Sequence, residues 1–217
     1  MPPIKAVVFD FDGVVVDSNR VKADAFGALY TPYGEAIAQE VVAFHLAHGG
    51  MPRAEKFRHW QRDIVDGPHD EATITDLGRR FGEMVKEKVK RVPEIPGAEA
   101  ALKALSARLP LHMASATPQT ELEEIVEARG LDRYFASIHG VPTSKADALR
   151  MRLAEGFAPD EILMVGDATA DHAAAVTVGT RFLGIVPPGT ASVFPDGTET
   201  MPDLTGLPAY VLGEAVP

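Results

Sequence analysis

Two aspartates, Asp10 and Asp12, stand one residue apart at the end of a strand-forming run, in the segment AVVFDFDGVVVDSN (residues 6–19). Side chains of an extended chain alternate between its two faces, so both carboxylates point to the same side. Like charges held this close repel each other and raise each other's pKa. The pair therefore predicts either a positive ion between the carboxylates or direct use of one of them in chemistry.

Other polar side chains stand where later predicted strands end. Ser115 ends one strand, and Lys145 lies in the loop after the next. The segment VGDATAD then brings Asp167 and Asp171 to the end of a further strand. Each residue alone is explained by a helix cap, a turn or a solvated charge. Because ligands bind at the carboxyl ends of the strands in an open parallel sheet, their arrival in order favours one shared site.

The elements that would position these residues alternate between strands and helices. Residues 4–9 form a nearly continuous apolar run, as in a strand buried on both faces of a parallel sheet. Further strands are expected at residues 109–115, 135–140, 161–167 and 181–186. Residues 20–91 are helical in period and contain no convincing strand. The sequence thus predicts an α/β fold, a doubly wound parallel sheet with an inserted α-helical cap domain.

Domain boundaries are indicated by two prolines and a glycine in VPEIPG (residues 92–97), which break the helical region. We expect a core domain formed by residues 1–16 and 95–217 and a cap domain formed by residues 17–94. The proline- and glycine-rich tail beyond Pro187 gives no readable pattern.

Composition narrows the class of protein. The 217 residues carry a net charge of -10, which argues against a nucleic-acid partner, since such a partner requires a basic footprint. The absence of cysteine rules out disulfides and thiolate metal sites and fits a reducing compartment. Asp10 and Asp12 interrupt the first apolar run, so we expect no secretory leader, and no stretch approaches the about 18 apolar residues of a membrane span. We expect a cytoplasmic protein without membrane contact.

The segments DFDGVVVDS, MASAT, SKADAL and VGDATAD together resemble the haloacid dehalogenase superfamily. The resemblance is to the branch of helical-cap phosphatases and β-phosphoglucomutase-like enzymes, and it spans nearly the whole chain. It implies a Rossmann-like core, a cap inserted after the first strand, and phosphoryl chemistry at the strand ends.

The resemblance also implies a role for each candidate residue. Asp10 would be the nucleophile that forms an aspartyl-phosphate, and Asp12 the general acid and then the general base. Mg²⁺ would neutralise the carboxylates; its ligands would be Asp10, Asp12 through its backbone carbonyl, Asp167, and Asp171 directly or through water. The phosphoryl oxygens would be held by Ser115, Lys145 and backbone N–H groups near Phe11, Gly13 and Ala116.

Two departures from relatives bear on this assignment. Many relatives have proline after the motif lysine, whereas Ala146 follows Lys145 here. The dehalogenase and phosphonate-cleaving branches lack the second aspartate, so Asp12 disfavours both. A phospho-accepting signalling receiver also gathers such residues at strand ends, but it would not need the insertion of residues 20–91.

Cap residues bear on substrate choice. The segment HGGMPRAEKF places a glycine pair before Arg53 and Lys56, a composition that suits a loop closing over a site. We expect Arg53 to reach the substrate, because its planar fork grips a carboxylate or second phosphate with two bonds. We interpret His45 and His48 as a solvated helix end rather than a zinc site, and Trp60 as part of the cap core.

The most direct interpretation is a Mg²⁺-dependent phosphomonoester hydrolase that acts on a small phosphorylated metabolite through an aspartyl-phosphate. The alternative is a sugar phosphomutase of the β-phosphoglucomutase type, which must shield the same intermediate from water. Phosphoglycolate, a sugar phosphate and a nucleotide all remain open as substrates, and the protein would be a monomer or a homodimer.

Overall fold

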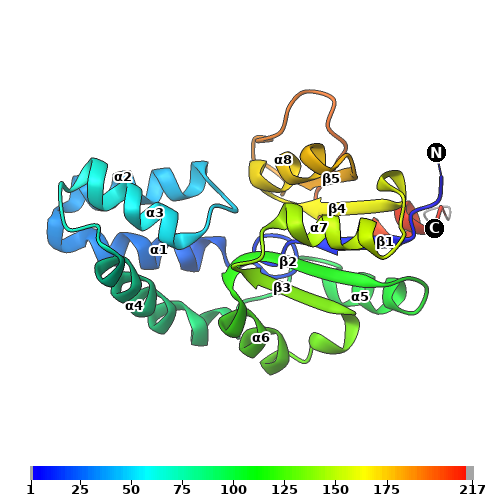
Figure 1. The fold of residues 1–217 in the computed structure, drawn as a ribbon, viewed down its shortest axis with the longest axis horizontal. Coiled ribbons are helices and arrows are strands. Elements are labelled where there is room, and N and C mark those ends of the chain that lie inside the picture. Colours follow the sequence, from blue (N-terminus) through cyan, green and yellow to red (C-terminus); the bar gives the residue numbers. More distant parts are fainter. Residues whose placement is uncertain (1, 214–217) are drawn as a thin grey trace.

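The apolar run that begins at Ile4 becomes β1 (Ala6–Phe9), a central strand of the six-stranded sheet in the computed structural model, which describes residues 2–213 (Figure 1). The strand order is β3-β2-β1-β4-β5-β6, and every pair is parallel. The other strands are β2 (Leu111–Pro118), β3 (Ser137–Val141), β4 (Ile162–Gly166), β5 (Arg181–Ile185) and β6 (Thr200–Met201). The predicted doubly wound parallel sheet is therefore confirmed.

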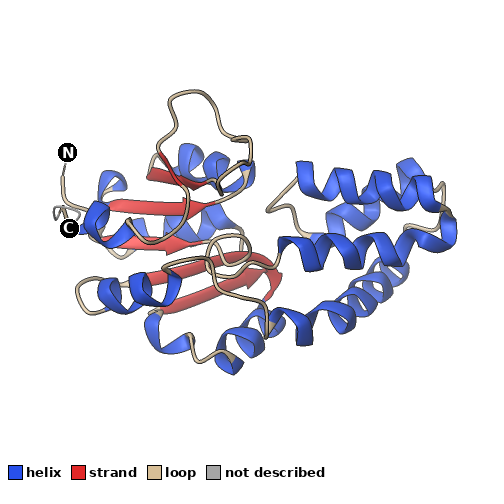
Figure 2. Cartoon of the chain, turned by 180° about the vertical axis from the view of Figure 1, so that it is seen from behind, coloured by secondary structure: helices blue, strands red, loops and turns tan. Residues whose placement is uncertain are grey.

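Helices cover both faces of this sheet (Figure 2). They are α5 (Ala98–Ser106), α6 (Gln119–Ala128), α7 (Lys145–Ala154), α8 (Thr169–Val178) and α9 (Leu207–Leu212). Val7 and Phe9 belong to the apolar cluster that includes α5, α6 and α9, whereas Val8 belongs to the cluster with α7 and α8. This alternation along β1 is the period of two expected for a strand that is buried on both faces.

The inserted region is helical, as expected. It consists of α1 (Asn19–Tyr30), α2 (Glu35–Ala47), α3 (Arg53–His59) and α4 (Glu71–Val89). A π-helical turn, Trp60–Ile64, continues α3, and short 3-10 turns lie at Thr31–Tyr33, Asp132–Tyr134 and Pro159–Glu161. Trp60 is fully buried against Phe26 and Phe57, as expected for a cap core. The helices that carry these aromatic side chains form one end of the molecule (Figure 1), and their buried side chains belong to the same apolar cluster as Val7 and Phe9 of β1.

The chain enters and leaves the cap through two segments that lie side by side. The Asp17 N–H donates to the Pro93 carbonyl at 2.9 Å, and the Ile95 N–H donates to the Val15 carbonyl at 3.0 Å. These bonds lie at the boundaries that the sequence predicts, after residues 16 and 94. The domain division itself stays a prediction.

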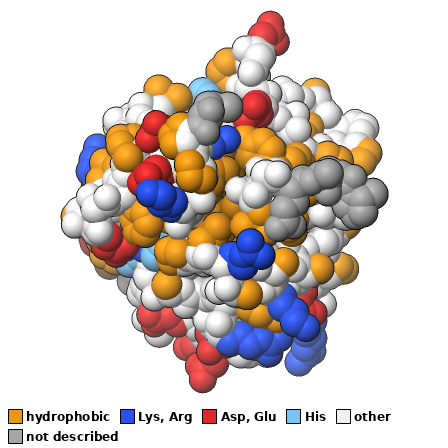
Figure 3. Space-filling view, turned by 90° about the vertical axis from the view of Figure 1, so that its right-hand side faces the viewer, with side chains coloured by type: hydrophobic (Ala, Val, Ile, Leu, Met, Phe, Trp, Pro, Cys, Tyr) orange, Lys and Arg blue, Asp and Glu red, His pale blue; other side chains and the backbone are white. Residues whose placement is uncertain are grey.

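The tail that the sequence left unread adds β6 to the sheet edge and packs α9 beside α5. No helix within residues 2–213 is long and apolar enough to cross a membrane. The end of the molecule away from the cap carries apolar side chains among charges of both signs (Figure 3).

Candidate active site

Strand register brings the predicted site residues to one edge of the sheet. Phe9 of β1 lies opposite Met113 of β2 and Val165 of β4. The residues that follow these positions by one or two are Asp10, Ser115 and Asp167. They emerge together at the carboxyl edge, which faces the cap.

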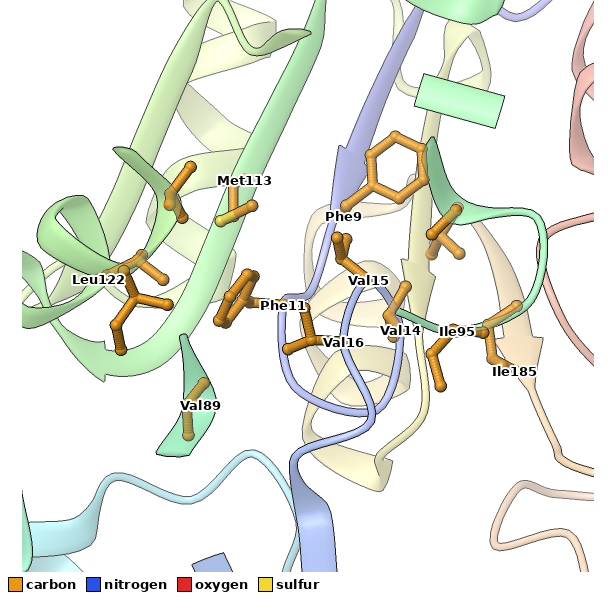
Figure 4. Close-up of a cluster of buried hydrophobic side chains, with 14 of the residues drawn as sticks. Phe9, Phe11, Val14, Val15, Val16, Val89, Ile95, Met113, Leu122 and Ile185 are labelled. Atoms are coloured by element: carbon orange, nitrogen blue, oxygen red, sulfur yellow. The ribbon is translucent and has the colours of Figure 1, made fainter. Parts of the chain in front are cut away.

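Buried apolar side chains hold the loop that carries the two aspartates. Phe11, Val14, Val15 and Val16 are all fully buried and point into the core (Figure 4). The Val15 and Val16 N–H groups both donate to the Phe11 carbonyl, at 2.9 and 3.1 Å. The buried side chains and these hydrogen bonds therefore fix the loop between β1 and α1, which restricts the positions of the two aspartates.

Three carboxylates form the deepest part of the site. Asp10, Asp167 and Asp171 each offer an oxygen, and these oxygens lie within 4.8 Å of one another. Lys145 Nζ is 2.6 Å from Asp10 Oδ2 and also donates to Asp171 Oδ1. Asp167 instead accepts from the Asn19 side-chain amide at 2.8 Å, so one ammonium group stands against three carboxylates and leaves an excess of negative charge for a cation to balance.

The electrostatics of the cluster agree with this excess. Burial raises the pKa of Asp10 well above its ordinary value; Lys145 lowers it, and the neighbouring carboxylates raise it further. Partial burial and the charge of Asp171 raise the pKa of Asp167 to about 7. Although burial disfavours the charged lysine, Asp10 and Asp171 hold the pKa of Lys145 above its ordinary value. Hard carboxylate oxygens clustered in this way are the donor set that Mg²⁺ prefers, so the residues fit that ion.

Asp12 has a different environment. Its Oδ2 accepts from Lys22 Nζ at 2.5 Å and from Thr117 Oγ1 at 3.2 Å, and its Oδ1 accepts from the Ser18 hydroxyl. Burial alone would raise the pKa of Asp12, but Lys22, Ser18 and Thr117 together hold it below the ordinary value. The pKa values of the two aspartates of the opening motif are therefore shifted in opposite directions, which is a frequent property of paired catalytic carboxylates.

Lys22 and Thr117 were missed by the sequence analysis. Lys22 lies in α1, and its Nζ is 3.0 Å from Thr117 Oγ1 at the end of β2. A lysine in the first turns of a helix is usually solvated, so the residue type alone did not indicate a role in the site. Its position opposite Asp12 depends on the direction in which α1 follows the loop after β1, which the sequence does not show.

The expected phosphoryl-binding groups lie around the same edge. Ser115 is buried, and its Oγ accepts from the Thr117 N–H at 3.1 Å. Ala116 lines the pocket directly. The Gly13 N–H donates to the Val16 carbonyl at 2.8 Å, so it already has an acceptor within the loop.

Gly13 is required by space as well as by conformation. Its φ is +75°, in the left-handed region, and a Cβ there would lie 2.0 Å from Asp167 Oδ2. Only glycine allows the loop to pass this close to the carboxylate cluster.

The glycine pair of the cap also makes a close approach. A Cβ on Gly49 would lie 2.9 Å from Ala168 Cβ, and one on Gly50 would lie 2.8 Å from Ala170 Cβ and 3.3 Å from Lys145 Nζ. The loop between α2 and α3 therefore rests directly on the core beside the site. Cap and core together enclose a pocket of about 880 Å³, including space open to solvent, lined by Asp10 and Asp12.

The cap cations have partners within the described chain that the sequence did not indicate. Arg53 lines the pocket, but its guanidinium donates two bonds to Glu121 of α6, at 2.8 and 3.2 Å. His45 is buried rather than solvated, so that prediction is wrong: α2 packs with its last turn against Phe26 and over the pocket. Lys56 is 2% exposed and lies 2.7 Å from His45 Nδ1.

A family model for haloacid dehalogenase-like hydrolases matches residues 4–179. Among curated proteins, the chain is 29% identical to a phosphoglycolate phosphatase of Chromobacterium violaceum, over 84% of this chain and 85% of that protein. It is 27% identical to a phosphorylated carbohydrates phosphatase of Thermotoga maritima, over 84% and 86% of the two chains.

A solved structure of a predicted phosphoglycolate phosphatase from Haemophilus somnus has a similar fold, with a TM-score of 0.74. It is 22% identical, and the alignment covers 95% of this chain and 97% of that one. At that identity the likeness concerns the fold, including the arrangement of sheet and cap.

Proposed function

The chain belongs to the haloacid dehalogenase-like hydrolases, and from this premise we propose that it is a Mg²⁺-dependent phosphomonoester hydrolase that uses Asp10 as its nucleophile. The observation that carries the proposal is the contrast between the two aspartates at the end of β1. Asp10 lies in the carboxylate cluster beside Lys145, whereas Asp12 stands apart, bonded to Lys22 and Thr117. This contrast supports a nucleophilic role for Asp10 and a proton-transfer role for Asp12.

In the first half-reaction a carboxylate oxygen of Asp10 attacks phosphorus. The bond between phosphorus and the ester oxygen breaks, and protonated Asp12 gives its proton to the departing oxygen. In the second half-reaction Asp12, now ionised, takes a proton from water while the water oxygen attacks phosphorus. Phosphate leaves and the Asp10 carboxylate is restored.

The metal would be held by Asp10, Asp167 and Asp171, together with the Asp12 carbonyl. When bound, Mg²⁺ neutralises the carboxylate cluster and withdraws charge from the phosphoryl oxygens. Lys145 and Ser115 would stabilise the charge that develops on those oxygens, and Ala116 would offer its N–H. Three carboxylates around one ammonium support this division of roles, since an anionic ester could not approach Asp10 without a further positive charge.

A small phosphorylated metabolite is supported by the substrates named for the similar curated phosphatases. The mutase alternative uses the same first half-reaction and differs only in the acceptor of the phosphoryl group. Release of free phosphate is therefore the discriminating result.

The experiment is a screen of the purified protein against phosphorylated metabolites, with Mg²⁺ or with EDTA, in which free phosphate is measured. We expect phosphate release that requires Mg²⁺ and that is lost in Asp10→Asn. An isomerised sugar phosphate without free phosphate would favour the mutase, and turnover that survives in Asp10→Asn would contradict the mechanism.

A further inference from the structure

Lys56 is a buried cation in the cap wall of the pocket. It lies in α3 with only 2% of its surface exposed, and it lines the same pocket as Asp10 and Asp12. Within residues 2–213, its hydrogen-bonding partner is His45, with 2.7 Å between Lys56 Nζ and His45 Nδ1. No carboxylate of the described chain forms an ion pair with it. A buried charge without a counter-charge is unfavourable, and burial lowers the pKa of Lys56 to about 7. An anion beside Lys56 Nζ would therefore favour the charged form, and the described chain supplies none.

His45 serves as an acceptor for Lys56. Burial and the nearby Lys56 charge lower the pKa of His45 to about 3, so the imidazole is neutral at ordinary pH. A neutral ring offers one nitrogen as an acceptor, and Nδ1 faces the ammonium group. An ammonium group has three N–H donors, and His45 takes one of them. The remaining donors are available to a ligand, and the bond to His45 fixes where they point.

The other cations that line this pocket already have carboxylate partners. Lys22 pairs with Asp12 at 2.5 Å, and Arg53 pairs with Glu121 at 2.8 Å. Lys56 differs from both in this respect. An anionic group that enters the cap side of the pocket would therefore meet Lys56 without displacing an existing ion pair.

The surroundings of Lys56 would strengthen such a contact. Its Nζ lies 5.8 Å from the ring centre of Phe26, and Phe26 and Phe81 stack at 4.0 Å between centroids; both rings line the pocket. An apolar wall excludes water and lowers the local dielectric constant, so a charge-assisted hydrogen bond is stronger there than at the surface.

We propose that Lys56, oriented by His45, binds a second anionic group on the leaving-group side of the substrate, so that the preferred substrate carries a carboxylate or a second phosphate beside the phosphoryl group that is transferred. The inference rests on the proposed function, because it names the class of ester that this site would select. The proposal assigns substrate specificity to Lys56 rather than to Arg53, because the Arg53 guanidinium is already bonded to Glu121. Lys56 lies one turn further along α3.

The test compares two pairs of esters that differ in one anionic group. The first pair is 2-phosphoglycolate and 2-hydroxyethyl phosphate, and the second is glucose 1,6-bisphosphate and glucose 6-phosphate. For the wild-type protein we expect at least one charged member to have a kcat/KM about tenfold to a hundredfold above that of its neutral partner, as one charge-assisted hydrogen bond provides. The pair that shows the preference identifies the anion as carboxylate or phosphate.

The variant Lys56→Met keeps the length of the side chain and removes its charge. We expect it to lose that preference, mainly through a higher KM for the charged member, while Lys56→Arg restores part of it. The control is Lys88→Met on the exposed face of α4, which makes the same change in net charge away from the pocket. If Lys56→Met does not fold, Lys56→Gln serves in its place.

The outcomes separate this inference from the proposed function. Equal kcat/KM within both pairs for the wild type would overturn the inference and leave the hydrolase intact. A preference that persists in the folded Lys56 variants would overturn it too, because the anion would then bind elsewhere. Failure to hydrolyse any ester in the wider screen would instead contradict the proposed function.

Discussion

Replacement of Lys22 by methionine tests the role assigned to Asp12. The Lys22 ammonium lies 2.5 Å from Asp12 Oδ2, and the two side chains are only 13% and 16% exposed. A hydrogen bond to a charged group at such a site contributes about 1.5–3 kcal/mol to the ionised form of the acid. Its removal should reduce the ratio of ionised to protonated Asp12 roughly tenfold to a hundredfold at a given pH.

The sign of the effect follows from the two opposing causes. Burial raises the pKa of Asp12, and Lys22 is the largest of the influences that lower it. Without Lys22, the effect of burial on the pKa of Asp12 is less compensated. The pKa therefore rises, and Asp12 is ionised only at higher pH. Since the second half-reaction requires ionised Asp12, phosphate release should slow most on the acidic side.

The assay is the pH dependence of kcat with an aryl phosphate, whose good leaving group makes the first half-reaction easy. For Lys22→Met we expect the acidic limb of the profile to move to higher pH, while Lys88→Met keeps the wild-type profile. An acidic limb at the wild-type pH in a folded Lys22→Met protein would refute the reasoning, since Asp12 would then not depend on this lysine.

Three other changes test the rest of the site. In Asp10→Asn, turnover of any ester should fall roughly a thousandfold or more, and the free energy of unfolding measured in EDTA should rise because a like charge is removed from the cluster; wild-type-like turnover would contradict the covalent route. Gly13→Ala should lower stability by at least about 1–2 kcal/mol, because its φ of +75° and the 2.0 Å approach of a Cβ to Asp167 both forbid a side chain; an unchanged melting temperature would show that the loop sits elsewhere. The losses in the free energy of urea unfolding caused by Arg53→Ala and Glu121→Ala should not add, because the two side chains share two hydrogen bonds; we expect a coupling energy of about 0.5–3 kcal/mol. Additive losses would show that this pair does not hold the cap against α6.

Most of the fold could be predicted from local pattern. The apolar run of β1 and the later strand segments end at polar residues, and parallel register then obliges Asp10, Ser115 and Asp167 to meet at one edge. Ser144 caps α7 through the Asp147 N–H at 3.1 Å, which places Lys145 in the first turn, facing the carboxylates. The family and the fold class are confirmed, whereas the roles of the individual site residues stay predictions.

The cap side of the site could not be predicted in the same way. Which face of a helix meets the pocket depends on how the cap helices pack on one another and on the core, and a one-residue rotation exchanges exposed and buried positions. His45 was therefore expected at the surface and lies inside, and nothing in the sequence indicated that Lys56 is buried. The short β6 and α9 were missed because their few residues carry no periodic signal of their own.

The central claim is that Asp10 becomes phosphorylated during turnover, and it is tested most directly by trapping that acyl phosphate. The protein is quenched with borohydride during hydrolysis of an ester in Mg²⁺, which reduces an acyl phosphate to the alcohol, and the peptide of residues 6–20 is sequenced by mass spectrometry. We predict reduction at Asp10 that depends on both ester and Mg²⁺ and that is absent from Asp10→Asn. Active turnover without reduction at Asp10, or with reduction at Asp12 instead, would contradict the account.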